Sequence, residues 1–423
     1  MSRKNVFRVF SIFVISIILI ILFNITSISN FIIVWYFWLI ISLYLYNNRL
    51  VISIYIVLTM FSTSAYVAAN LGYIYFYIPK EIIEEVTSKS LFSILLSYLI
   101  TIALLELLGN KKMLNLKEVS QRFQNEIEWI APNKILLLNF VLLVILSYFY
   151  FNLLINVDIN SFITNPRAVK QQVYGVVAEH YFQVFIFPTT LIMVLRFIKT
   201  KSKFNFISII LLILLWIPLV LIGERKVLYL IVLGILLFGG FKPQKIISVG
   251  IVSLLFFLFL PLVREGWLGF DDWILSFHEF ILPQYFSFLL HTLHPSVLET
   301  ISSTSGYLTG AQALLPSFFR IFQYEPLGLS FYNLDLTNVG IAANPIGEAY
   351  INFGEKGYFI FSFLFSCTLI LLFYFSEKNY LFWIVGLPYT FLAGRSDLWI
   401  SFFFIIYSYL LLSILMTRKK IIK

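Results

Sequence analysis

The chain has 423 residues, of which 60% are hydrophobic and only 12% are charged, and its formal net charge is +9. A soluble domain has about 25% charged residues, so this composition excludes a soluble globular protein and indicates one that uses a bilayer as its solvent. The single cysteine, Cys367, excludes an intrachain disulfide framework. The basic residues are spread over loops between apolar segments, so the positive charge does not indicate a nucleic-acid partner.

Twelve apolar segments are candidates for membrane-spanning helices, each of which takes about 20 residues. They lie near residues 7–28, 31–46, 50–70, 90–108, 135–155, 181–198, 207–222, 227–241, 246–263, 357–376, 380–393 and 398–416. The first segment is longer than the apolar region of a signal peptide and no small-residue cleavage site follows it, so we expect it to stay uncleaved. We therefore predict an all-α polytopic membrane protein with about twelve transmembrane helices.

The basic residues orient these helices through the positive-inside rule. When the basic N-terminus is placed in the cytoplasm and the sides alternate, the cytoplasmic loops hold 20 basic and 4 acidic residues. The outer face then holds 10 basic and 16 acidic residues. This alternation predicts an even number of spans with both termini in the cytoplasm, where the basic groups face anionic lipid.

One loop is much longer than the others and divides the chain into three parts. Residues 1–263 hold helices 1–9 with short loops, residues 264–356 form the large outer loop, and residues 357–423 hold helices 10–12 and a basic tail. The loop has 93 residues, nine of them acidic and three basic. A structureless loop of this length is uncommon. We expect an interfacial helix over Trp273–Leu290, capped by Asp271 and Asp272, although a re-entrant segment stays open.

Two tight outer turns carry charged residues that are rare on this side of a membrane. Gly223-Glu224-Arg225-Lys226 separates helices 7 and 8, and Arg395 and Asp397 lie in the turn between the last two helices. A planar guanidinium grips a diphosphate through two parallel hydrogen bonds. The alternatives are a side chain that anchors at the lipid headgroups and a structural ion pair within the second turn.

The end of the large loop has the sequence N-P-I-G-E-A-Y-I-N-F-G over residues 344–354. Asn-Pro starts a turn, and the helical spacing that follows places Glu348 and Asn352 on one face, one turn apart. A carboxylate and an amide in this arrangement can address a sugar hydroxyl. The alternative is an interfacial helix with a solvated polar stripe.

Two outer histidines, His291 and His294, also lie one turn apart. Such a spacing is compatible with metal ligation, but Pro295 breaks the helix and the H-E-x-x-H pattern of zinc proteases is missing. We therefore expect no metal site. The chain also lacks the G-x-x-x-x-G-K-[ST] loop of ATPases, so the groups available for chemistry are those of the outer loops.

The order of these features resembles the O-antigen (oligosaccharide repeat-unit) polymerases of the Wzy family. The resemblance rests mainly on residues 344–357, N-P-x-G-E-A-Y-x-N-F-G-x-x-G, with support from residues 223–226 and 394–397. It implies a GT-C-like membrane glycosyltransferase that joins repeat units carried on undecaprenyl diphosphate, at the periplasmic face of a bacterial inner membrane. The donor then carries its own leaving group, so no cofactor, nucleotide or metal is expected.

The resemblance also implies roles for particular residues. Glu348 is the leading candidate for the catalytic base, followed by Asp397 and His291. The candidates for holding the diphosphate and the sugars are Arg225, Arg167, Arg264, Arg320, Arg395, Lys226, Asn344, Tyr350 and Asn352. The expected partners are lipid-linked glycans, membrane lipid and a chain-length regulator.

Two other functions stay open. O-antigen ligases share the large outer loop before helix 10, and His291 and His294 are compatible with that reaction. A flippase or transporter of the lipid-linked unit would also be basic on its inner side with about twelve spans. It would have short loops on both sides and cations within the bundle, which this sequence lacks.

Overall fold

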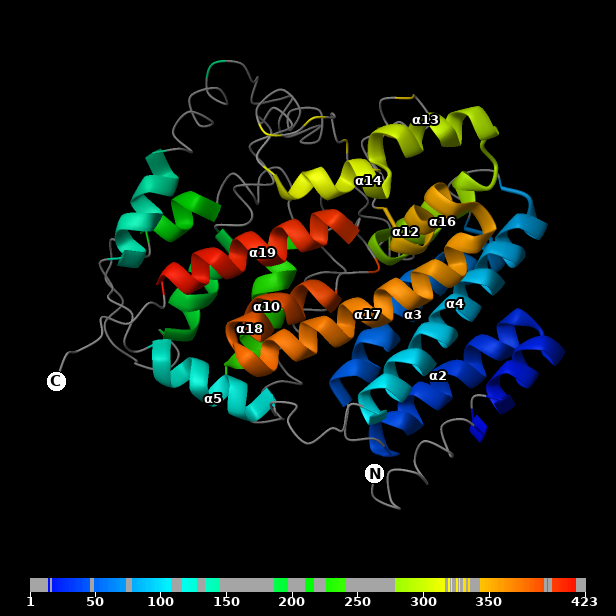
Figure 1. Cartoon of the computed structure of the whole chain (residues 1–423), viewed down its shortest axis with the longest axis horizontal. Helices are drawn as coiled ribbons and strands as arrows, with labels where there is room; N and C mark the ends of the chain where they lie inside the picture. Colours follow the sequence, from blue (N-terminus) through cyan, green and yellow to red (C-terminus); the bar gives the residue numbers. More distant parts are fainter. Residues whose placement is uncertain are drawn as a thin grey trace. The chain divides into compact units, whose positions relative to one another are not determined.

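The computed structural model describes most of the predicted helical segments. It covers residues 14–45 except 16, 49–73, 78–107, 116–127, 134–144, 186–196, 210–216, 226–239, 278–315, 343–391 and 398–415, with isolated residues between these ranges. Its named helices are α2 (Ile28–Leu45), α3 (Arg49–Asn70), α4 (Lys80–Leu107), α5 (Leu116–Ile127), α10 (Lys226–Phe238), α12 (His278–Leu290), α13 (Pro295–Ser305), α14 (Tyr307–Gly310), α16 (Pro345–Phe353), α17 (Gly357–Lys378), α18 (Leu381–Phe391) and α19 (Leu398–Leu415), with short 3-10 turns η2 (Ala311–Leu314) and η4 (Gly354–Lys356) (Figure 1). No strand occurs within the described ranges.

Three helices in this part of the chain are long and apolar enough to cross a membrane. They are Leu50–Asn70, Lys80–Leu107 and Pro345–Phe375, and each contains a segment that the sequence predicted to span. Shorter apolar helices that overlap five further predicted spans lie at Ile28–Leu43, Lys134–Val144, Ile186–Arg196, Leu381–Phe391 and Phe404–Leu415. The prediction of an all-α membrane protein is therefore confirmed. The predicted span at 246–263 lies outside the described residues.

The chain forms two compact units, each with its own packing. The first contains Met1–Met113, Leu258–Phe375 and Tyr389–Phe403, and the second contains Leu114–Phe257, Ser376–Pro388 and Phe404–Lys423. In the second unit α5 packs on α10, and the Ser120 hydroxyl and the Gln124 amide both donate to the Phe238 carbonyl, at 2.9 and 2.8 Å. These bonds satisfy a carbonyl that the end of α10 leaves open.

In the first unit α4 and α17 run in the same direction. Ser93 is 3.1 Å from Ser362 between hydroxyl oxygens, and Ser97 is 3.0 Å from Ser366. The second contact lies four residues after the first on both helices, so the two helices are parallel. Small residues that form interhelical hydrogen bonds allow close packing of membrane helices. The N-terminal ends of α4 and α17 therefore lie together.

Helix α12 is enclosed by protein instead of lying on a surface. It packs on α3, α4 and α16, and the side chains of residues 281–290 are all buried except Leu289. Its Gln284 oxygen accepts from the backbone N–H groups of Ala65 and Tyr66 in α3, at 2.8 and 3.2 Å, and its amide donates to the Thr87 hydroxyl of α4 at 3.0 Å. The interfacial helix expected here would expose one face, so this part of the loop differs from the prediction, while residues 273–277 lie outside the described ranges.

The remaining described part of the large loop packs against α12. Helices α13 and α16 contact each other, and apolar side chains from several segments form one buried cluster: Leu282, Phe286, Leu290, Ile301, Leu327, Phe331, Ala343 and Ile351. Burial of such side chains stabilises each by about 1.5–3 kcal/mol. The large loop thus has a core of its own, and α12 connects it to α3 and α4 of the first unit.

Candidate functional site

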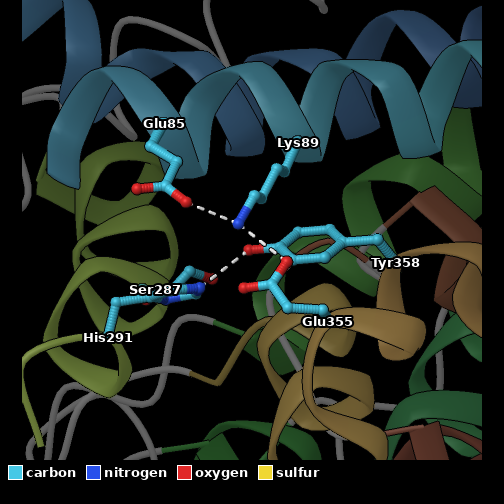
Figure 2. Close-up of polar contacts among 6 residues, drawn as sticks. All are labelled: Glu85, Lys89, Ser287, His291, Glu355 and Tyr358. Carbon is cyan, nitrogen blue, oxygen red and sulfur yellow. Dashed lines mark hydrogen bonds and ion pairs between the residues drawn. The ribbon is translucent and has the colours of Figure 1, made fainter. Parts of the chain in front are cut away.

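A group of polar and aromatic side chains meets where α4 and α17 begin. We call it the histidine cluster, and it consists of Glu85, Lys89, His291, Tyr350, Glu355 and Tyr358. Figure 2 shows Lys89 reaching down from α4 toward Glu355 and Tyr358, while His291 faces the Tyr358 hydroxyl from α12. Three regions far apart in sequence thus contribute to one site: α4, the residue that follows α12, and the continuous segment of α16, η4 and α17.

The hydrogen bonds of His291 define its tautomer. Its Nδ1 is 2.9 Å from the backbone carbonyl of Ser287, which can only accept, so Nδ1 carries the proton. Its Nε2 then has the lone pair and accepts from the Tyr358 hydroxyl at 3.1 Å. Both ring nitrogens are thus engaged by the protein when the imidazole is neutral.

Burial keeps this imidazole neutral. It lowers the pKa of His291 below the ordinary value of 6.5 and is the largest cause of the shift. The backbone bond to Ser287 and the carboxylates of Glu355 and Glu85 act in the opposite direction, while the nearby Lys89 lowers the pKa further. At neutral pH His291 is therefore an uncharged hydrogen-bond acceptor for Tyr358.

Tyr350 links His291 to the surface of the loop. The two rings stack with their centroids 3.9 Å apart and their planes inclined by 23°. The Tyr350 and Tyr358 rings are 6.1 Å apart in a tilted arrangement. Aromatic pairs of this kind contribute about 0.5–1.5 kcal/mol beyond the burial of their area, so the three rings fix one another's orientation.

Lys89 is the cation of the cluster. Its ammonium lies 2.6 Å from the Glu85 carboxylate, 2.7 Å from the Glu355 carboxylate and 5.9 Å from the centre of the Tyr358 ring. The lysine side chain is 29% exposed and the carboxylates are 57% and 60% exposed, so solvent screens both pairs and each contributes no more than about 1 kcal/mol. The three charges sum to −1, and the Lys89–Glu355 pair joins α4 to η4.

An open groove of about 490 Å³ lies beside the cluster, between α13 and α16. Its α13 wall is Pro295, Leu298, Glu299, Ser302 and Ser303, and its other wall is Tyr350, Ile351 and Gly354. The α13 residues recur at intervals of three and four, which places them on one helix face. Tyr350 belongs to both features, since it lines the groove and stacks on His291.

The motif at the end of the loop builds the wall of this groove. Asn344 caps α16, because its side-chain oxygen accepts from the Ile346 N–H at 2.9 Å, and a proline follows at the first helical position. Asn352 accepts from the Tyr307 N–H at 2.8 Å and donates to the Glu348 carbonyl at 2.7 Å. Both amides are thus engaged in structural hydrogen bonds.

At two positions of this motif the structure explains why the residue is glycine. Gly354 has a φ of +57°, in the left-handed region that favours glycine. At Gly357 an added Cβ would lie 2.3 Å from the Ala349 carbonyl oxygen, so no side chain fits where α17 starts against α16. The N-F-G-x-x-G sequence is therefore required by the turn between the two helices.

The predicted catalytic and binding residues are distributed unevenly. His291 and Tyr350 lie in the cluster, and Glu348 is 1% exposed within α16, which excludes the alternative of a solvated stripe at this position. Lys226 begins α10 in the second unit. Arg225, Arg167, Arg264, Arg320, Arg395 and Asp397 lie outside the described residues.

Four members of the cluster were not among the predicted site residues: Glu85, Lys89, Glu355 and Tyr358. The Glu85–Lys89 spacing of four residues is a local helix signal, and it shows only that α4 extends outward beyond its apolar part. No family model, curated protein or solved structure matches this chain.

Proposed function

We propose that the chain is a membrane glycosyltransferase of the O-antigen polymerase (Wzy) type. It would join oligosaccharide repeat units carried on undecaprenyl diphosphate, at the periplasmic face of a bacterial inner membrane. The observation that carries this proposal is the convergence of His291 and Tyr350, from the large loop, with Lys89 and Tyr358 at the ends of two apolar helices. A lipid-linked sugar is presented at this boundary between apolar and polar surroundings.

The parallel packing of α4 and α17 agrees with the proposed alternation of sides. Alternation of sides along the chain puts the start of both helices on the outer face. Two neighbouring helices that start on the same face must run parallel. The Ser93–Ser362 and Ser97–Ser366 contacts follow that direction. The histidine cluster and the groove would then both face the periplasm.

The proposed reaction needs no energy source beyond the donor itself. A hydroxyl oxygen of the acceptor glycan attacks the anomeric carbon of the donor, and the new carbon–oxygen bond forms as the bond to the diphosphate breaks. The bonding electrons leave with the lipid diphosphate, and the hydroxyl proton passes to a base. The protein supplies orientation of the two glycans and fixed charge at the leaving group.

The charge of the histidine cluster favours the acceptor over the diphosphate. Glu85, Lys89 and Glu355 have a net charge of −1 in mutual contact, which repels an anionic leaving group. Arg225 and the other outer arginines named above remain the proposed diphosphate ligands, since a guanidinium binds phosphate oxygens in pairs.

Glu348 remains our first candidate for the base, and Asp397 our second. A buried carboxylate is rare in proteins and is associated with functional sites. His291 is better suited to positioning, because the Ser287 carbonyl and the Tyr358 hydroxyl already occupy its two nitrogens. Its neutral ring would hold Tyr350 and Tyr358 in place.

The O-antigen ligase reaction is the second candidate, because a ligase would also place a histidine of the large loop beside the membrane helices. A strain that lacks this protein separates the possibilities when its surface glycan is run on a gel. We expect lipid capped with a single repeat unit, which is the product of a missing polymerase. Uncapped lipid would instead indicate a ligase, and repeat units that accumulate in the cytoplasm would indicate a flippase.

A further inference from the structure

The groove between α13 and α16 has the features of a glycan site. Its volume of about 490 Å³ falls in the range of about 300–1,000 Å³ that is usual for ligand pockets. It is open along the face of α13, so it suits part of a chain that extends beyond it. An inorganic ion would leave most of this space empty.

The lining residues include an aromatic ring on one wall and polar side chains on the other. Tyr350 offers an aromatic ring, and that ring is already held in orientation by its stack on His291. Glu299, Ser302 and Ser303 face the groove from α13. A sugar has an apolar face of C–H groups and an edge of hydroxyls, which match a fixed ring on one side and hydroxyl and carboxylate partners on the other.

The charge of the lining residues indicates which class of sugar the groove can bind. Among the described residues that line the groove, Glu299 is the single charged side chain and none is basic. A carboxylate can accept hydrogen bonds from neutral hydroxyls or from an amino group, but it repels another anion. The groove therefore disfavours uronic acids, phosphorylated sugars and the diphosphate of the donor.

We infer that this groove binds the sugar chain of the acceptor glycan, with Tyr350 stacked against a sugar ring, and that it selects neutral or amino sugars over acidic ones. This inference rests on the proposed function and deepens it. The acceptor assignment follows from the charge, because the donor must have its diphosphate close to the reacting sugar and needs cations there. The groove holds the acceptor chain beside the histidine cluster.

Sugar binding by the full-length protein in nanodiscs tests this inference through saturation-transfer NMR. The probes are a glucose disaccharide, an N-acetylglucosamine disaccharide and a galacturonic acid disaccharide, each at millimolar concentration. We expect saturation transfer to at least one of the first two and none to the acidic disaccharide. Absence of transfer to both neutral probes, or equal transfer to the acidic one, would overturn the inference.

Substitutions in the groove provide the matched comparison. Tyr350→Ala should weaken binding of the neutral probe about two- to tenfold, as expected for loss of an aromatic stack, whereas Tyr350→Phe should bind as the wild type does. Tyr374→Ala, at a half-exposed position near the C-terminal end of α17, is the control and should change nothing. Equal binding by Tyr350→Ala and the control would refute the site.

A variant that is expected to gain binding provides a test that unfolding of the protein cannot imitate. Glu299→Gln removes the charge that the described lining carries, at an exposed position, so the acidic disaccharide should now give saturation transfer. If Glu299→Gln still rejects it, the charge argument is wrong. Failure of the two proposals can be told apart: normal ladders in a strain without the protein would refute the polymerase but not the site, and unaltered sugar binding by Tyr350→Ala would refute the site alone.

Discussion

Replacement of Gln284 by leucine tests how α12 is held within the first unit. The side chain is buried, and its carboxamide makes three hydrogen bonds: to the N–H groups of Ala65 and Tyr66, and to the Thr87 hydroxyl. Leucine has a similar volume and can make none of them. His291 follows seven residues later, directly after the end of α12, so its position depends on the same contacts.

The expected loss of stability follows from these bonds. A hydrogen bond contributes about 0.5–1.5 kcal/mol net in water-soluble proteins, and about 0.6 kcal/mol on average between membrane helices. Three bonds therefore amount to about 2–4 kcal/mol. This corresponds to roughly a 30- to 700-fold change in the folding equilibrium constant, at tenfold per 1.4 kcal/mol.

Unfolding of the purified protein in mixed micelles, by increasing amounts of a denaturing detergent and with circular dichroism as readout, measures this loss. Gln312→Leu is the control, because the Gln312 oxygen accepts from the Ile321 N–H at an exposed position where water can replace it. The control should shift stability by no more than about 0.5 kcal/mol. If Gln284→Leu is as stable as Gln312→Leu, the contacts of α12 with α3 and α4 are not those described above.

Four further predictions concern the site and the topology. Because burial lowers the pKa of His291, unfolding free energy should be highest above pH 6.5, the ordinary value, and should fall as the pH decreases toward the lower pKa of the folded protein; a titration of His291→Gln should lack this decrease. Gly357→Ala should destabilise the protein by about 1–3 kcal/mol through overpacking, measured by the same unfolding assay. In a cysteine-free background, cysteine at Ser303 should react with an impermeant thiol reagent from outside, whereas cysteine at Leu116 should not. Arg225→Ala should abolish the glycan ladder at normal protein abundance, and Arg225→Lys should restore it only in part, because lysine lacks the bidentate fork.

The helices and the capping motif could be predicted because their signals are local. Apolar runs define most of the described helices, and Asn344 with its following proline predicts the start of α16 at the position where the structure has it. The predicted apolar segment at 90–108 covers only the later part of α4, which begins at Lys80. Hydropathy ends at the polar residues there, whereas helical pairs such as Glu85–Lys89 continue the helix outward.

The histidine cluster could not be predicted in the same way, since its contacts join distant segments. Nothing near Lys89 in the sequence indicates Glu355 as its partner, and nothing near His291 indicates Tyr358. The enclosure of α12 was also missed. Its aromatic composition fits an interfacial helix and a buried one equally well, and the choice is made by Gln284, whose partners in α3 and α4 are fixed only by the tertiary fold.

Polymerisation by the purified protein is the most direct test of the central claim. The protein is reconstituted in liposomes with undecaprenyl-diphosphate-linked repeat units as the only substrate, and product length is measured on a gel together with the free lipid diphosphate. We predict a ladder that grows by one repeat unit per step, with one lipid diphosphate released for each bond formed. Lipid-linked units that remain at their original length, with no lipid diphosphate released, would contradict the account.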